Sequence, residues 1–207
     1  MSPALEQLPR GRHGLTRDEV ERSQRIRIMR GMAEAMRVDG YANTPVAAVI
    51  TRAGVSRETF YQHYASKLDC FLAAFDFFAD RLGTRLTAAV RGEGDPLARF
   101  ERAVNVYLEN LAAQPGYARL FVVEAYAAGL EAMDRRAEVQ RRIVEAIAEA
   151  FGAEGERDRF ACRVVVAALA TMVTGPLVAG DASALRALGP QMVAHVRALF
   201  EAGLLGR

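Results

Sequence analysis

Two short helix patterns meet across only three residues, Ala53-Gly54-Val55, and this spacing constrains the fold more than any other feature of the sequence. The first pattern starts at Thr44-Pro45, where Thr44 is suited to cap a helix and Pro45 to occupy its first position. Gly54 readily takes the positive φ that closes a helix, and Ser56 can cap a second helix two residues later. The apolar face of the first helix holds Val46, Val49, Ile50 and Ala53. A short, glycine-containing turn between two short helices is typical of the helix-turn-helix motif.

The second helix, residues 56–64, is the candidate recognition helix, because the second helix of such a motif can enter the major groove of DNA. Phe60 and Tyr64 lie four residues apart and can pack inward together with Val55. The remaining side chains project elsewhere and include donors and acceptors for base edges: Arg57, Glu58, Thr59, Tyr61, Gln62 and His63. A helical hairpin inside a bundle, with an ordinary polar surface, is the alternative, and the spacing favours DNA binding.

Helix signals flank this pair on both sides. Thr16 and Glu19 fit a capping box, in which each side chain satisfies a free backbone amide of the other. Apolar residues then recur at close to a 3.6-residue period until Asp39-Gly40 supplies a stop. On the other side, Ser66 and Asp69 start a helix that carries Phe71, Leu72, Phe75 and Phe78. The first third of the chain is therefore expected to be a three-helix domain followed by a long helix.

Charge is distributed unevenly along the chain. The net charge is only +2, but the residues through Leu68 include eleven basic and seven acidic side chains. The first third therefore has a net charge of +4 and the remainder −2. A basic segment before a mildly acidic one suits a domain that meets phosphates joined to one that does not, although a solvated helical surface has the same balance.

Composition narrows the remaining classes. The chain of 207 residues is 51% hydrophobic and 25% charged, is rich in alanine and arginine, and contains one lysine, Lys67. These values predict an ordered all-α protein. Residues 1–16 lack the apolar core of a secretory signal, so a cytoplasmic location is expected. Residues 164–180 are uncharged but shorter than the roughly 20 apolar residues of a membrane span. A buried core helix is the interpretation of that stretch, and no membrane association is expected.

Catalytic and metal-binding patterns are absent from the sequence. The two cysteines, Cys70 and Cys162, form no zinc or disulfide motif, and the second half holds only His195 as a histidine. No Ser/His/Asp set, phosphate loop or HExxH motif occurs. We therefore expect no enzyme activity, no metal and no cofactor.

The rest of the chain also reads as helices. Breaks at residues 91–94 and at Pro115-Gly116 bound a helix that starts at Asp95-Pro96 and runs to about Gln114. A shorter helix over residues 117–128 and a longer one over residues 130–151 follow, and the charge run around Arg135 and Arg136 in the longer helix predicts a solvated face. Pro176 and Pro190 are expected to kink or restart the last helices.

The last two helical stretches carry apolar stripes at bundle spacing. The stripes are Phe160, Val164, Ala168, Met172 and Gly175 in the first stretch, and Leu185, Leu188, Met192, Val196 and Leu199 in the second. Small residues at Ala168 and Gly175 would allow two helices to approach closely. His195 lies beside the second stripe and is expected to be a satisfied polar group.

Three segments resemble the N-terminal domain of the tetracycline-repressor (TetR) family: residues 40–46 (GYANTPV), 53–56 (AGVS) and 59–67 (TFYQHYASK). The resemblance covers about residues 16–80, and the remainder matches the family only in length and helical character. It implies an N-terminal DNA-binding domain over residues 1–66 and a helical effector-binding and dimerisation domain over residues 67–207. Glu58 departs from the family, in which a small residue is frequent at this position.

The resemblance also implies roles for individual residues. Thr44, Pro45 and Lys67 would meet DNA phosphates, and Tyr61 and His63 would mainly grip the backbone. Arg57, Glu58, Thr59 and Gln62 would lie near base edges, with Arg57 suited to a bidentate contact with guanine. For Tyr61 and His63, a packing role and a helix-capping role are the alternatives. Arg10 and Arg12 belong to a segment similar to the basic extension of some members, and would reach the minor groove.

For the body, the resemblance implies an effector pocket and a homodimer formed through the last two helices. Six aromatic residues near the junction are candidates to line the pocket, although core packing is expected for at least half of the aromatics there: Phe75, Phe78, Tyr107, Tyr117, Phe121 and Tyr126. The expected function is a dimeric repressor that a small, largely apolar effector releases from double-stranded operator DNA. The alternatives are a helical dimeric interaction module that binds no specific DNA, and an enzyme, for which the sequence offers no residues.

Overall fold

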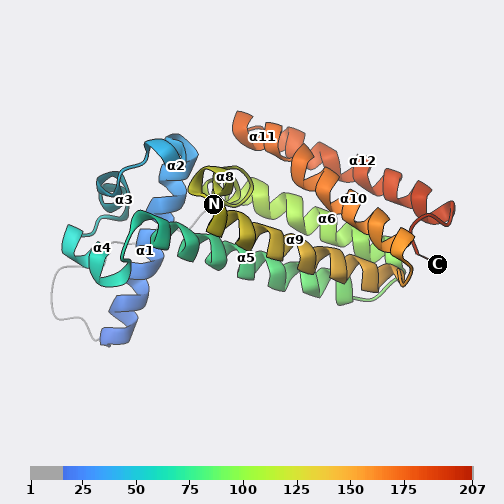
Figure 1. Cartoon of the computed structure of the whole chain (residues 1–207), viewed down its shortest axis with the longest axis horizontal. Coiled ribbons are helices and arrows are strands. Elements are labelled where there is room, and N and C mark those ends of the chain that lie inside the picture. The colour runs from blue at the N-terminus through green and yellow to red at the C-terminus, as the bar shows by residue number, and fades with distance from the viewer. Residues whose placement is uncertain (1–15, 207) are drawn as a thin grey trace.

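The computed structural model describes residues 16–206, which form helices and connecting loops with no β-strand. In chain order, the elements are α1 (Arg17–Val38), α2 (Gly40–Asn43), α3 (Val46–Ala53), α4 (Arg57–His63), α5 (Lys67–Arg91), α6 (Pro96–Ala113), α7 (Pro115–Arg119), the π-helix η1 (Leu120–Glu124), α8 (Ala125–Ala128), α9 (Leu130–Phe151), α10 (Glu156–Met172), α11 (Thr174–Ala179) and α12 (Ala182–Glu201). The predicted all-α class is confirmed. Figure 1 shows α1–α4 at one end of the molecule, here called the head, and the long helices of the body beside it.

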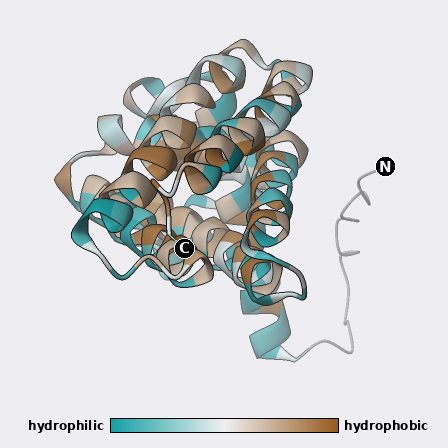
Figure 2. Ribbon diagram, turned by 90° about the vertical axis from the view of Figure 1, so that its right-hand side faces the viewer, coloured by the Kyte–Doolittle hydropathy of each residue, from teal (hydrophilic) through white to brown (hydrophobic). Residues whose placement is uncertain are grey.

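The head begins with the predicted capping box. The Thr16 hydroxyl accepts a hydrogen bond from the Glu19 amide, and the Glu19 carboxylate accepts one from the Thr16 amide, 2.7 Å away. The first turns of α1 are exposed and hydrophilic, as Figure 2 shows, whereas the second half of the helix buries Ile28, Met32 and Met36. Helix α1 thus has a solvated start and an end that lies in the core.

Helices α1 and α3 approach each other closely at Gly31. A Cβ atom at this position would lie 2.9 Å from both the Ala53 nitrogen and the Val49 carbonyl oxygen. Glycine is therefore required by backbone contact, because neither of these atoms belongs to a side chain that can rotate away. The sequence patterns did not single out Gly31.

Helix α5 starts in the head and continues into the body, where it packs against α6 and α9 (Figure 1). Its start is the predicted one, since the Ser66 hydroxyl accepts a hydrogen bond from the Asp69 amide. Along its length Phe71, Phe75 and Phe78 are buried in a core shared with the head. The helix consequently connects the two parts of the chain through one rigid element.

The predicted helix over residues 117–128 is only partly correct. Helix begins at Pro115, and residues Leu120–Glu124 form a π-helix between α7 and α8. In a π-helix each hydrogen bond spans one more residue than in an α-helix, and such turns are frequent at functional sites. The predicted helix over residues 130–151 coincides with α9.

The interpretation of residues 164–180 as a buried core helix is wrong. One stretch among the described residues, Glu156–Ala179, is long and apolar enough to cross a membrane by length and composition alone, but only 28% of its most apolar window is buried. Val164 is 48% and Phe160 58% exposed on α10, and Val178 is 53% exposed on α11. These side chains form an outward apolar face, which folding of the single chain leaves uncovered.

The second predicted stripe behaves in the opposite way. Leu185, Met192 and Val196 are buried because α12 packs on α6 of the same chain. Pro190 lies inside α12 without restarting it, and Pro176 lies inside α11. His195 is exposed on the other side of α12.

Candidate nucleic-acid interface and effector pocket

The turn between α3 and α4 has the predicted backbone and an additional clamp. Gly54 has φ 61° and ψ 44°, and the Ser56 hydroxyl accepts a hydrogen bond from the Thr59 amide at 3.0 Å. Arg27 of α1 donates from Nε and Nη2 to the Ala53 carbonyl oxygen, at 3.1 and 2.9 Å, and from Nη2 to the Gly54 carbonyl oxygen. A basic side chain at a helix C-terminus donates to free carbonyl oxygens and interacts favourably with the negative end of the helix dipole. Arg27 therefore holds the turn, a role that no pattern in the sequence indicated.

Helix α4 presents one apolar and one polar side, as predicted. Phe60 and Tyr64 are 0% and 2% exposed, with ring centroids 5.9 Å apart. On the other side Arg57, Glu58 and Gln62 are exposed. Tyr61 is 44% exposed, and the Arg57 guanidinium lies 5.4 Å from the centroid of its ring. The exposed side of α4 thus offers a stacked arginine together with amide and carboxylate groups.

Thr59 and His63 are partly engaged within the head. The Thr59 hydroxyl lies 2.9 Å from the Ser56 hydroxyl at the start of α4. The His63 Nε2 atom lies 2.9 Å from the Gln24 Oε1 atom of α1, and the imidazole is half-buried. His63 therefore connects the end of α4 to α1. This contact is independent of the predicted contact between His63 and the DNA backbone.

The start of α3 differs from the prediction. Its N-cap is Pro45 rather than Thr44, and no side chain caps it. Thr44 is 1% exposed, and its hydroxyl donates to the Gly40 carbonyl oxygen at 2.6 Å. The prediction that Thr44 caps this helix is wrong, because its hydroxyl bonds backward to α2. Pro45 is exposed.

Lys67, at the first position of α5, lies against the end of α2. Its Nζ atom donates to the Tyr41 carbonyl oxygen at 2.8 Å and lies 4.1 Å from the centroid of the Tyr41 ring. Burial lowers the pKa of the Lys67 ammonium group. Because an ammonium group has three donors, Lys67 retains capacity for a phosphate oxygen beside the Tyr41 carbonyl. Arg10 and Arg12 lie outside the described residues.

A buried carboxylate joins the head to the body. Glu124 of η1 is 6% exposed, and its Oε2 atom accepts a hydrogen bond from the Tyr41 amide at 2.8 Å. Its Oε1 atom accepts from Arg119 Nε at 3.0 Å, and Arg119 also donates to the Arg37 carbonyl oxygen at 3.4 Å. Gly116 makes a second close contact between the two parts, since a Cβ atom there would lie 2.7 Å from the Ala33 carbonyl oxygen. These contacts transmit the position of η1 to α1 and α2.

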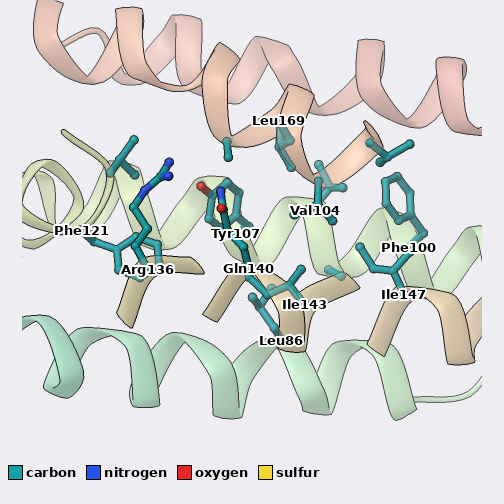
Figure 3. Close-up of a pocket in the computed structure, with 15 residues that line it drawn as sticks. Leu86, Phe100, Val104, Tyr107, Phe121, Arg136, Gln140, Ile143, Ile147 and Leu169 are labelled. Carbon is teal, nitrogen blue, oxygen red and sulfur yellow. The ribbon is translucent and has the colours of Figure 1, made fainter. Parts of the chain in front are cut away.

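The body encloses a narrow, mostly apolar cavity of about 60 Å³ between α5, α6, α9 and α10 (Figure 3). Of the six predicted aromatics, Tyr107 and Phe121 line it. Sequence reasoning missed the other lining side chains, because they are ordinary helix-face residues: Leu86, Phe100, Ala103, Val104, Val122, Arg136, Gln140, Ile143, Ile147, Val165, Val166, Leu169 and Ala170.

The other four predicted aromatics do not line this cavity, and their contact with an effector stays a prediction. Phe75, Phe78 and Tyr117 pack into the aromatic core beside it, where the Phe78 and Tyr117 rings stack at 5.9 Å. Tyr126 is 58% exposed on α8. The six aromatics come from five different elements, so aromatic character alone did not identify those that face the cavity.

Polar groups gather at one part of the cavity. Figure 3 shows the polar ends of Arg136, Gln140 and Tyr107 near one another, with Phe100 and Ile147 toward the other end. Burial raises the pKa of Tyr107 to about 12, and the nearby charge of Arg136 acts in the opposite direction. Arg136 donates to the Tyr126 hydroxyl at 2.9 Å, and its guanidinium stacks on that ring at 5.0 Å. The predicted solvated face holds for the exposed Arg141 and Arg142, whereas Arg136 is half-buried and also borders the cavity.

Comparison with known proteins bears directly on the head. Residues 28–74 match the model for bacterial regulatory proteins of the tetR family, a range that contains α2, α3 and α4. This part of the chain belongs to the tetR family of bacterial regulatory proteins. The matched residues include the turn at Gly54, the recognition helix and Lys67.

Relatives of this tetR-family chain match about half of it. The nucleoid occlusion factor SlmA of Marinomonas sp. (strain MWYL1) is 30% identical over 108 residues, which are 52% of this chain and 55% of the relative. The HTH-type transcriptional activator FasR of Mycolicibacterium smegmatis is 30% identical over 95 residues, 46% of this chain and 42% of the relative. The chain spans about half the length of the curated relatives it matches.

Solved structures match the tetR-family chain over most of its length and show its fold. The fatty acid degradation regulator FadR from Bacillus halodurans has a TM-score of 0.72 at 20% identity, covering 82% of this chain and 95% of that one. FadR from Bacillus subtilis, solved in complex with stearoyl-CoA, has a TM-score of 0.67 at 17% identity, covering 82% and 95%. The head and body together thus have the arrangement of these proteins.

Proposed function

We propose that this tetR-family protein is a homodimeric, ligand-responsive transcriptional regulator that binds double-stranded DNA. The observation that carries the proposal is the match of residues 28–74 to the family, together with the exposed polar side of α4. We further propose that it is a repressor, released from a pseudo-palindromic operator by its effector. A role on DNA would place it in the cytoplasm.

The proposed DNA contacts divide into base readers and phosphate contacts. Arg57, Glu58 and Gln62 are exposed on α4 and would reach base edges, with Thr59 at the start of that helix. Tyr61 and Lys67 would bind phosphates. Pro45 and the free amides at the start of α3 would approach a phosphate through the backbone, because the Thr44 hydroxyl is occupied.

A second copy of the chain is the proposed cover for the exposed apolar face. Phe160, Val164 and Met172 of α10 and Val178 of α11 are each more than 40% exposed, and they follow one another at helical spacing. On α12 the outward side offers small residues, Ala187, Ala194 and Ala198, that would let a partner helix approach closely. Burying such a face in a dimer would place two α4 helices on half-sites about 34–36 Å apart.

The cavity beside η1 is the proposed effector site. Support comes from FadR of Bacillus subtilis, a protein of the same fold that holds stearoyl-CoA. The cavity shares Phe121 and Val122 with η1, and η1 ends at Glu124, which bonds to the head. A ligand that displaces Phe121 would therefore shift the carboxylate on which the Tyr41 amide depends. Helix α5, which begins at Lys67 and carries Phe75 and Phe78 in the core, offers a second route between cavity and head.

The deciding experiment is binding of the purified protein to genomic DNA fragments, including the region upstream of its own gene, across a salt series. We expect a specific fragment to be bound at moderate salt, with a footprint of two half-sites one helical turn apart. Uniform weak binding, or none, by a folded dimer would contradict the regulator and favour a helical interaction module without specific DNA binding.

Two variants separate the proposed roles on the fragment so found. Lys67→Ala should weaken binding to all sequences and reduce the salt slope by about 1, because one phosphate contact is lost. Arg57→Ala should instead relax base preference at one position, at a cost of about 1–3 kcal/mol. Arg141→Ala, which removes an exposed arginine of α9, serves as the control for the change in charge. An unchanged salt slope for Lys67→Ala would contradict its role.

A further inference from the structure

The proposed effector cavity contains one cation and no side chain that neutralises it. No aspartate or glutamate lines the cavity, and within residues 16–206 Arg136 forms no ion pair. Its neighbours on α9 differ, since Arg135 pairs with Asp76 and Glu131, and Arg141 and Arg142 pair with Glu138. Arg136 is thus the arginine of this run that faces an apolar space without a carboxylate.

The groups around Arg136 are those that would complete a site for an anion. A guanidinium has five N–H donors, and the described residues engage one of them, through the Tyr126 hydroxyl. The Tyr107 hydroxyl makes no hydrogen bond to the described residues, and burial keeps it protonated and able to donate. The Gln140 amide adds two further donors from the next turn of α9. Figure 3 shows these three side chains ending in the same region.

The rest of the cavity is a slot for an alkyl chain. From Arg136 the lining continues along α9 through Ile143 to Ile147, with Val104 and Phe100 of α6 opposite. Eleven residues of α-helix rise about 16 Å, so the slot has the length of a medium acyl chain. The part of the slot between Gln140 and Ile147 is lined by apolar side chains alone, so it disfavours a polar tail.

The free space in the slot is about 60 Å³, whereas ligand sites commonly hold 300 Å³ or more. A neighbouring groove of about 460 Å³ between α5 and α9 shares Leu86, Ala103, Ile143 and Ile147 with it. These apolar side chains border both spaces. A tail longer than the slot would need to displace Leu86 and Ile143 toward this groove.

We propose that the effector is an anionic amphiphile, an unbranched alkyl chain whose carboxylate or phosphate head binds Arg136. The role of this ligand as an effector rests on the proposed function. The binding of an anion by Arg136 does not. An anion on the remaining donors of Arg136 would lie beside the Tyr126 hydroxyl, which the same guanidinium binds. Tyr126 lies two residues after Glu124, the residue of η1 that bonds to α2. The anionic group of the ligand would therefore act on the segment that joins the body to α1–α4.

Calorimetry with the full chain in the absence of DNA tests the chemistry. The probes are dodecanoate and dodecyl phosphate, each below its critical micelle concentration, and dodecanol below its solubility limit. We expect at least one anionic probe to bind the unmodified protein about tenfold or more tightly than dodecanol, since only the anions form an ion pair with Arg136. Whichever of the two anions binds more tightly identifies the head group. Equal affinity for dodecanol and both anions would overturn the proposal without recourse to any variant.

Substitution identifies the residue. Arg136→Gln should lower affinity for the preferred anion about tenfold and change that for dodecanol less than twofold. Arg141→Gln is the matched control, on the same helix with the same loss of charge but outside the cavity, and should bind as the unmodified protein does. Retained anion preference in Arg136→Gln, or equal losses for anion and alcohol, would overturn the role of Arg136.

The DNA experiment separates this proposal from the proposed function. A protein that binds a specific fragment but does not distinguish dodecanoate or dodecyl phosphate from dodecanol retains the regulator and overturns the anionic effector. A protein that binds an anion through Arg136 but binds no specific DNA retains the ligand site and overturns the regulator.

Discussion

Burial controls the chemistry of single residues in the body, and Tyr107 is the clearest case. It is 8% exposed, and the cost of desolvating a phenolate raises its pKa from 10.0 to about 12. The same burial that makes the hydroxyl a dependable donor at neutral pH makes its ionisation unfavourable for the folded state. Burial also raises the pKa of the Cys70 thiol, so this cysteine is an unreactive core residue rather than a nucleophile.

Tyr107 should make the folded state lose stability at alkaline pH. Above pH 10 the unfolded chain releases the phenolic proton first, so the free energy of unfolding falls between pH 10 and about 12. Denaturant titrations at pH 8 and pH 11 should show a loss that is about 1–2 kcal/mol smaller in Tyr107→Phe than in the unmodified protein. An equal loss in both proteins would assign the pH dependence to other groups.

At the scale of elements, the π-helix η1 is the contact point between cavity and head. It lies between α7 and α8, it places Phe121 and Val122 in the cavity wall, and it ends in the buried carboxylate of Glu124. A π-helix differs from an α-helix by one residue in its hydrogen-bond register. A small change of register in η1 would therefore move Glu124 relative to the Tyr41 amide by a discrete step.

Glu124→Gln should weaken the junction between head and body. The substitution keeps the shape of the side chain but removes the charge that Arg119 pairs with in a mostly buried setting, so unfolding should become about 1–3 kcal/mol easier. Denaturant-induced unfolding measures this loss. Glu138→Gln is the control, because that exposed carboxylate pairs with two surface arginines and should change stability by less than about 0.5 kcal/mol.

The same pair of variants also tests signalling. If η1 carries the effector signal, Glu124→Gln will bind the effector with normal affinity but release DNA less completely than Glu138→Gln does. Equal stability and equal release in the two variants would exclude Glu124 from both roles.

At the scale of the whole molecule, the folded single chain has an exposed apolar face on α10 and α11. Helix α12 covers α6 with its apolar stripe, whereas α10 and α11 turn theirs outward. Exposed apolar surface of this extent marks a site of association. A homodimer formed there would join two heads into one unit with a defined separation between the α4 helices.

Val164→Glu should separate that dimer. Each copy would place an unpaired carboxylate in an apolar contact, and the cost of burying it would raise the dimer dissociation constant at least tenfold. Sedimentation at several concentrations measures the dissociation, and DNA affinity should fall with it. Val38→Glu, at another exposed valine near the end of α1, is the control and should remain dimeric. A dimer of unchanged strength in Val164→Glu would exclude this face.

Local signals in the sequence determined where most helices begin and end. The capping residues Thr16, Ser56, Ser66 and Asp95, and the left-handed Gly54, act through atoms within a few residues, so their effect is readable without a structure. The periodicity of α9 and the inward side of α4 follow for the same reason. The domain boundary and the DNA-contacting residues rest on the family resemblance and stay predictions.

Only the tertiary structure decided which side chains meet across the chain. Arg27 on the α3–α4 turn, Glu124 on the Tyr41 amide and Arg136 in the cavity each depend on partners that the sequence places apart. Apolar spacing shows that a helix has a face to bury but not what covers it. The stripe of α12 is buried against α6, whereas that of α10 is exposed. Periodicity is a property of one helix, whereas burial is a property of the pair that packs.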